Sequence, residues 1–274
     1  MSATAATIRF DADRTARNVL DASAKFWWAV TALGQWLFAL YIAAYFGPKL
    51  ALHGIEGLQQ THLFNGFIPG DGLGNAAVAA HVLLAIVIMV GGPLQLIPQI
   101  RARFPAFHHW TGRIYVATAV TSSIAGLYLI WTRPLFGPLV NNVGTSLGGV
   151  LVIIFAAIAL RHAIARDIPT HQRWALRLFM AASAVWFLRV AVYAWGFLTG
   201  GAGMDSESFS GPFVTFIHFA QYLLPLAVLE MYLRARDRGT AQARFVAAAG
   251  LTAFTLVTGL GVFLLVAGSW LPRI

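Results

Sequence analysis

The sequence predicts an all-α integral membrane protein, a bundle of seven transmembrane helices. Hydrophobic residues make up 58% of its 274 residues and charged residues only 11%, which is more apolar than the core of a soluble domain of this length requires. Apolar windows of about 20 residues, long enough to cross a bilayer, recur along the chain. They lack the alternation typical of strands, so we expect helices to satisfy the backbone in lipid.

The expected spans follow a lead-in over residues 1–25. Charges are scattered through this segment and it lacks the uninterrupted apolar core of a secretory signal, so we expect a cytoplasmic, partly amphipathic lead-in. The seven spans are expected at Phe26–Phe46, Asn75–Ile97, Trp110–Trp131, Val143–Ile164, Trp174–Leu198, Pro212–Leu233 and Phe245–Trp270. Residues 26–274 would form one transmembrane domain. Its functional core would cover about 75–233, with the first and seventh spans packed outside it.

Basic residues indicate how the bundle is oriented. The chain has 19 Lys and Arg against 10 Asp and Glu, and the basic residues cluster in the lead-in and around the turns after the second, fourth and sixth spans. These segments would share one side of the membrane, so the positive-inside rule places the N-terminus in the cytoplasm. Because the basic residues do not form one patch, a nucleic-acid-binding face is excluded.

A short pattern recurs at the entries to the third and fifth spans. The segments Phe104–Arg113 and Ile168–Arg177 share Pro, Trp and Arg at a constant offset. Both hairpins would begin outside and turn inside, which predicts a parallel repeat of spans two and three with spans four and five. The alternative is convergence, because a proline, a basic residue and a tryptophan are common at membrane interfaces.

The stretch from His81 to Arg189 carries motifs of a known family. They are His81, Gly92-Pro93, His108 with Gly112, Arg113 and Tyr115, and then His171, Trp174 and Arg177. In these motifs the chain resembles a family of bacterial multi-pass membrane proteins described only as a domain of unknown function, number 2306. The resemblance implies this fold, the placing of the motifs and a bacterial cytoplasmic (inner) membrane, and it implies no activity.

Three ionisable residues lie deep within apolar stretches, namely His81, Arg189 and His218. Polar groups at membrane depth are costly and usually functional. His81 and His218 would lie at matching depth in the outer half, where two imidazoles could be the axial ligands of a haem b and Arg189 could bind a propionate. The alternatives are a bare metal ion or another ligand, or polar residues satisfied by backbone carbonyls, a tyrosine or cavity water.

A second cluster is expected at the inner rim, drawn from four spans. Its members are His108, His109, Arg113, His162, His171, Arg177 and Glu230. Such a positive pocket suits a lipid headgroup, a phosphate, a quinone or the propionates of a second haem. Alternatively, Glu230 neutralises one of the arginines, and the other basic residues extend into the headgroup layer.

Other site chemistries have less support. With no cysteine, disulfides, thiolate metal sites and covalent haem attachment are excluded. No nucleotide-binding or hydrolase motif is present. In the first outer loop His53, Glu56 and His62 have the ligand types of an open zinc site, but their spacing matches no known signature and favours a solvated loop.

The sequence therefore favours a b-type haem protein that transfers electrons, with His81, His218, Arg189, His108, His171, Arg113 and Arg177 as cofactor-binding residues and a quinone as a second ligand or redox partner. An enzyme of this kind would be a membrane haem oxidoreductase. The competing hypothesis is a proton-coupled transporter or permease for small solutes that uses the same buried groups. A noncatalytic scaffold is the third alternative, and an oligomer is compatible with all three.

Overall fold

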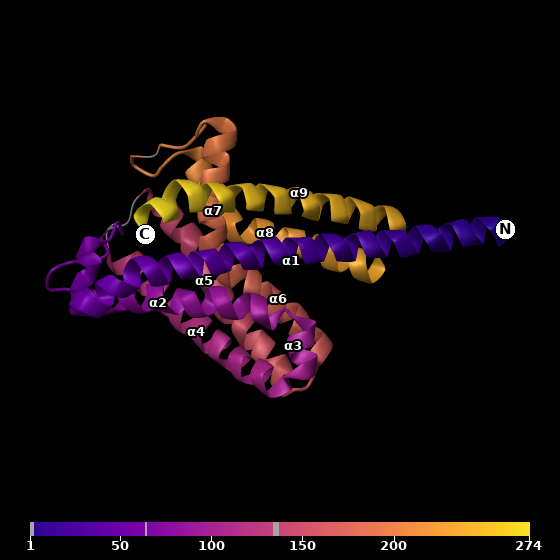
Figure 1. The fold of residues 1–274 in the computed structure, drawn as a ribbon, viewed down its shortest axis with the longest axis horizontal. Coiled ribbons are helices and arrows are strands. Elements are labelled where there is room, and N and C mark those ends of the chain that lie inside the picture. The colour runs from indigo at the N-terminus through magenta and orange to yellow at the C-terminus, as the bar shows by residue number, and fades with distance from the viewer. Residues whose placement is uncertain (1–2, 64, 134–136, 206) are drawn as a thin grey trace.

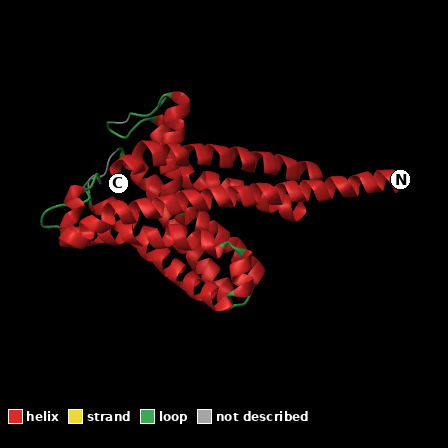
Figure 2. Cartoon of the chain, viewed as in Figure 1, coloured by secondary structure: helices red, strands yellow, loops and turns green. Residues whose placement is uncertain are grey.

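The computed structural model describes residues 3–63, 65–133, 137–205 and 207–274, and most of these residues are helical. The others form loops and one isolated β-bridge, between Asp205 and Ser210 (Figure 2). Six helices are long and apolar enough to cross a membrane, and a bent pair gives a seventh span. The predicted all-α membrane bundle is confirmed.

The helices follow the predicted order of spans (Figure 1). They are α1 (Ala3–His53), α2 (Gly72–Gln95), α3 (Pro98–Arg103), α4 (Pro105–Thr132), α5 (Leu139–Ile164), α6 (Ile168–Ala182), α7 (Ala184–Thr199), α8 (Pro212–Arg238) and α9 (Ala241–Leu265). A 3₁₀ segment η1 (Gly54–Gln60) follows α1, and two short turns, η2 (Val266–Trp270) and η3 (Leu271–Arg273), follow α9.

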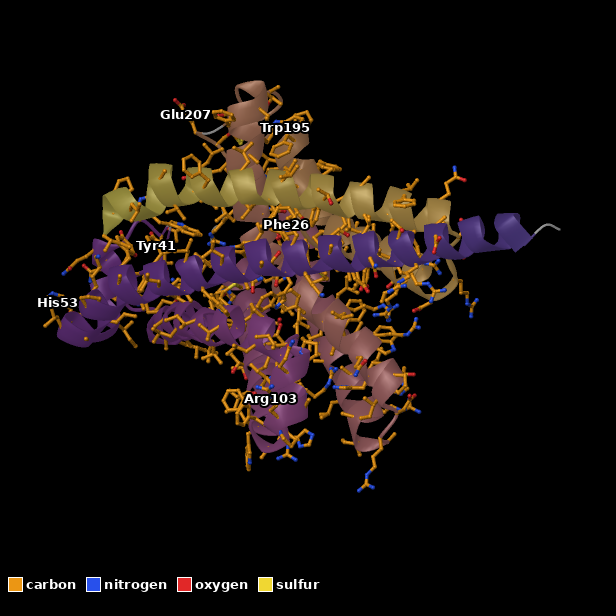
Figure 3. All side chains as sticks on the ribbon, turned by 45° about the vertical axis from the view of Figure 1, so that its right-hand side comes forward. Phe26, Tyr41, His53, Arg103, Trp195 and Glu207 are labelled. Atoms are coloured by element: carbon orange, nitrogen blue, oxygen red, sulfur yellow. The ribbon has the colours of Figure 1, made fainter. Side chains whose placement is uncertain are left out.

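The lead-in and the first span form one continuous helix. At 51 residues, α1 is about 75 Å long, more than twice the roughly 30 Å of a bilayer's hydrocarbon core. It runs beside α9, and its N-terminal end projects beyond the bundle (Figure 1). Figure 3 follows the same helix from Phe26 through Tyr41 to His53. Residues 1 and 2 of the predicted lead-in lie outside the described residues.

Part of the lead-in is packed against the bundle. Leu20 lies in a small apolar cluster with Ala235 of α8 and Ala247 of α9. Asp13 forms an ion pair with the buried Arg244, with Oδ1 and Nη1 3.1 Å apart. Packing against α8 and α9, together with this ion pair, therefore helps to fix the direction of α1.

The fifth span is broken at Ser183 rather than straight. Helices α6 and α7 meet there at 52°. The ψ of Ser183 is 0°, well away from the helical value near −42°, and its hydroxyl accepts a hydrogen bond from Nε2 of Gln35 at 2.9 Å. Both side chains are almost fully buried. The end of α7 leans out past α9, where Trp195 and Glu207 lie (Figure 3).

The two predicted repeat motifs have the same local structure. Proline stands in the first turn of both α4 and α6, where its missing N–H costs nothing. The Arg113 guanidinium lies over the Trp110 ring at 5.1 Å, and that of Arg177 over the Trp174 ring at 4.7 Å. The constant offset in the sequence therefore corresponds to a repeated Trp–Arg contact in the structure.

A glycine sets the approach of α9 to α7. A Cβ added to Gly261 would lie 2.3 Å from the backbone oxygen of Val190, closer than any relaxed contact permits. We expect Gly261→Ala to destabilise the bundle by about 2 kcal/mol or more, because overpacking against backbone cannot be relieved by a rotamer change. Thermal unfolding in detergent measures this.

Gly259→Ala is the matched control in the same helix. Its Cβ would meet Val30 at an ordinary 3.5 Å, so the unfolding temperature should stay near that of the parent protein. Equal unfolding temperatures for the two variants would contradict the proposed close approach.

The predicted orientation can be tested with single cysteines, since the chain has none of its own. Gln99 in α3 and Ala202 between α7 and α8 are both exposed. We expect Gln99→Cys to react with a membrane-impermeant maleimide only after the cells are opened, and Ala202→Cys to react in intact cells. The opposite pattern of labelling would overturn the orientation.

Candidate functional site

The described residues line a cavity of about 540 Å³ in the half of the bundle that includes His81, and we call it the outer cavity. Residues from every span contribute to its wall, among them Phe38 of α1, Trp186 of α7 and Trp270 after α9. Its volume falls within the range of about 300–1,000 Å³ typical of small-molecule sites. Because α1 and α9 line it, the cavity extends beyond the predicted functional core of residues 75–233.

His81 borders this cavity and is fixed in orientation by α4. Its Nδ1 lies 2.9 Å from the backbone oxygen of Ser122 and 3.1 Å from the Ser122 hydroxyl. A carbonyl oxygen can only accept, so Nδ1 carries the hydrogen. Nε2 is then the nitrogen with the lone pair, and no described residue forms a hydrogen bond with it.

Arg189 borders the same cavity, as predicted from its depth. Its guanidinium donates a hydrogen bond to the Val185 carbonyl at 3.1 Å and lies 5.4 Å from the Phe38 ring centroid. A second arginine, Arg273, reaches the cavity from the segment after α9 and donates to the Ser269 hydroxyl. Among the described lining residues there is no Asp or Glu, so the cavity carries an uncompensated positive charge.

His218 is not among the described residues that line the outer cavity. Its Nδ1 lies 2.9 Å from the backbone oxygen of Val214, one turn earlier in the same helix, and its ring lies beside Phe209. Matching depth placed His218 level with His81 in the prediction. Depth does not determine which way a helix is rotated, and α8 turns Gln221 rather than His218 into the cavity.

Two further buried polar atoms at the outer cavity lack partners among the described residues. They are Nε1 of Trp186 and Oε1 of Gln221. The missing partners could be recognised only in the folded arrangement.

A second cavity, of about 1250 Å³, lies at the other end of the bundle and is called the inner cavity. It brings together His108, His109 and Arg113 of α4 with His171 of α6. The Nδ1 of His171 lies 2.9 Å from the backbone oxygen of Ala159, a contact between α6 and α5. These four members of the predicted inner cluster therefore share one cavity.

The other members of that cluster are paired elsewhere. Arg177 forms an ion pair with Glu230, with Nη2 and Oε1 2.7 Å apart, and this contact joins α6 to α8. Nδ1 of His162 lies 3.1 Å from Asp167. None of these residues is among the described residues that line the inner cavity. The contact with Arg177 is the one expected under the alternative in which Glu230 neutralises an arginine.

The first outer loop contains no zinc site among the described residues. No group of three or more histidines and carboxylates lies close enough there to hold a metal ion, so His53, Glu56 and His62 do not form a ligand set. His62 instead stacks on Tyr45, with ring centroids 6.1 Å apart, and borders the outer cavity.

Arg133 ties this loop to the start of α2. The buried guanidinium contacts Asp71 at 2.8 Å, Oδ1 of Asn75 at 2.6 Å and the backbone oxygen of Asn65 at 2.6 Å. The Gly74 N–H donates to the Asp71 carboxylate at 2.9 Å and, together with Arg133, holds the pKa of that carboxyl below its usual 3.8. The loop that carries His62 to the outer cavity is thus held by a charged clamp.

The pH dependence of this clamp follows from the direction of the shift. The pKa of Asp71 is lower in the folded protein than in the unfolded chain. The ionised carboxylate therefore contributes its full share of stability above about pH 3.8, and this share is lost as the pH falls through the lower folded pKa. We expect the protection against hydrogen exchange of peptides covering 65–75, relative to the unstructured chain at the same pH, to stay high from about pH 5 to 8 and to fall in stronger acid. In Asp71→Asn this protection should be lower throughout that range.

Asp205→Asn is the control for this measurement. The pKa of Asp205 is also lowered, by the Ser208 hydroxyl and neighbouring backbone N–H groups, but in a different loop. Its replacement should leave exchange in 65–75 unchanged. Equal protection of Asp71→Asn and the parent protein at neutral pH would argue against the clamp.

A family model described as predicted membrane protein (DUF2306) matches residues 78–224 of the chain. The match begins in α2, ends in α8 and contains His81, His108, His171 and Arg189. No curated protein and no solved structure matches the chain.

Proposed function

The chain belongs to the DUF2306 family of membrane proteins, and we propose that it is an electron-transfer protein whose outer cavity binds a noncovalent haem b through His81. The observation that carries this proposal is the orientation of His81 at the cavity wall, with Nδ1 bound to the Ser122 carbonyl and Nε2 left with its lone pair. A metal-ligating histidine usually donates its other N–H to such a partner, which fixes both tautomer and ring orientation.

The charges of the outer cavity support an anionic cofactor. Arg189 and Arg273 border it, and no described lining residue is acidic. Haem carries two propionates, and arginine binds carboxylates with paired, charge-assisted hydrogen bonds. The aromatic wall formed by Phe38, Trp186 and Trp270 suits the flat, apolar macrocycle. With no cysteine in the chain, the haem would be held without covalent bonds.

Each residue then has a defined task. His81 would hold the iron, and Ser122 keeps its imidazole ring in place. Arg189 and Arg273 would bind the propionates. His62 is the only other imidazole among the described lining residues, and we assign the iron ligand to His81 because its ring is fixed by a helix-to-helix hydrogen bond. The bound haem would supply one-electron redox chemistry, and the residues around it would tune its reduction potential.

Transport is the second candidate function, and one observation favours it. Consecutive residues around the break at Ser183 border different cavities, with Leu178–Met180 at the inner one and Ala181 and Ala182 at the outer one. A hinge between two chambers is typical of alternating access. In that case His81 and Arg189 would bind an organic anion and a proton.

The absorption spectrum decides between the two functions. Protein purified in detergent from cells supplied with a haem precursor should show a Soret band that sharpens and shifts on reduction with dithionite. We expect His81→Ala to lose most of this absorption, because it removes the iron ligand. Arg189→Gln should lower haem occupancy several-fold, because one propionate partner is lost.

His218→Ala is the matched control, since that imidazole is also buried but bonds within its own helix. It should keep the Soret band of the parent protein. Colourless parent protein, or equal loss in both histidine variants, would reject the assignment. Accumulation of a labelled organic anion in vesicles by a colourless protein, lost in Arg189→Gln, would establish transport instead.

A further inference from the structure

The inner cavity combines an apolar interior with a basic rim. Its wall includes Phe179 and Met180 of α6, Leu229 of α8 and Phe254 of α9. Among the described residues, the charged ones that border it are Lys25, Arg101, Arg113, Arg166, Arg236 and a single carboxylate, Asp21. A ligand that fits this cavity is therefore largely apolar, and its polar groups accept hydrogen bonds.

Two buried donors in this cavity have no partner among the described residues. They are the Tyr115 hydroxyl, in a residue 5% exposed, and Nε1 of Trp27, in a residue 7% exposed. The neighbouring Trp28 shows the usual arrangement, because its Nε1 donates to the Pro93 carbonyl at 3.2 Å. An unpaired buried donor is destabilising, so both positions are explained if a ligand oxygen accepts from them.

The packing around these donors sets their rings in the wall of the cavity. A Cβ added to Gly92 would lie 2.8 Å from the Phe179 ring and 3.2 Å from the Tyr115 ring, so the Gly-Pro motif of α2 makes room for both rings. Phe179 in turn meets Trp27 edge to face, at a centroid distance of 6.1 Å. The family motif residues Gly92 and Tyr115 thus shape the wall that carries the donors.

Two imidazoles of complementary hydrogen-bonding character complete the cavity. His171 donates from Nδ1 to the Ala159 carbonyl, which leaves Nε2 as an acceptor. With its amide nitrogen turned toward α4, Gln95 donates to Nδ1 of His108 at 3.0 Å, and its oxygen meets the Gly112 N–H at 3.3 Å. The hydrogen of His108 is then on Nε2, so this ring is a donor.

We infer that the inner cavity binds a membrane quinone, a neutral ring with two carbonyl oxygens and an apolar tail. The carbonyl oxygens would accept from Tyr115, Trp27 and His108, and the acceptor nitrogen of His171 would suit the hydroxyl of the reduced form. A lipid phosphate would bind at the rim arginines and leave the deep neutral donors unpaired. The inference concerns a different cavity from the haem proposal and does not depend on it.

The test is equilibrium binding of a tritiated short-tail ubiquinone to the purified full-length protein in detergent. We expect saturable binding to the parent protein and about tenfold weaker binding to Tyr115→Phe, which loses one hydrogen bond and almost no volume. The unfolding temperature of ligand-free Tyr115→Phe should equal or exceed that of the parent, because the hydroxyl removed has no protein partner. If the Tyr115 hydroxyl instead stabilised the fold, the unfolding temperature of Tyr115→Phe would be lower than that of the parent.

Tyr128→Phe is the matched control, since Tyr128 lies in the same helix and lines neither cavity among the described residues. It should bind the quinone as the parent does. Absence of saturable binding, or equal affinity in Tyr115→Phe, would overturn the inference. Displacement of the quinone by phosphatidylglycerol that depends on Arg113 and not on Tyr115, shown with Arg113→Gln, would overturn it in favour of an anionic lipid.

The outcome is distinguishable from that of the haem proposal, because the binding assay does not use haem absorption. Colourless protein with Tyr115-dependent quinone binding would support the inner site and reject the haem. Protein with a Soret band and no saturable quinone binding would reject the inner site alone.

Discussion

A polar atom within the bilayer must find its partner inside the protein, and this requirement governs how the histidines of this chain are arranged. His81, His171 and His218 all direct Nδ1 to a backbone carbonyl at 2.9 Å. For His218 the carbonyl belongs to its own helix. For His81 and His171 it belongs to a neighbouring helix, and these two rings are the ones that border cavities. A bond between helices thus both satisfies the donor and fixes the ring at the cavity wall.

The break in the fifth span lies close to the point where that span passes from one cavity to the other. Leu178–Met180 border the inner cavity, whereas Ala181, Ala182 and residues of α7 border the outer one, and Ser183 at the break is held by Gln35 of α1. Bulky side chains lie on both sides of this point, with Phe179 toward the inner cavity and Trp186 toward the outer. The continuous helices α2 and α4 also border both cavities, and in the fifth span the change from one cavity to the other falls within one turn of the bend.

The number of spans, their depth and the residues at the inner turns could be predicted from the sequence, because each depends on local hydropathy and spacing. Rotation about the helix axis could not, since it depends on which neighbours pack where. That is why His81 and Arg189 border the cavity that their depth suggested, whereas His218 does not. The continuity of α1 was missed because its charged first turns have no apolar signal, and their packing against α8 and α9 involves contacts distant in sequence.

The repeated Trp–Arg contact has a consequence for the symmetry of the molecule. In one copy Arg177 is neutralised by Glu230 and fastens α6 to α8. In the other, Arg113 has no acidic partner among the described residues and borders the inner cavity. The two copies of the motif therefore differ in charge: Arg177 is neutralised by Glu230, whereas Arg113 presents an unneutralised guanidinium to an anionic or electron-rich molecule that approaches that end of the bundle.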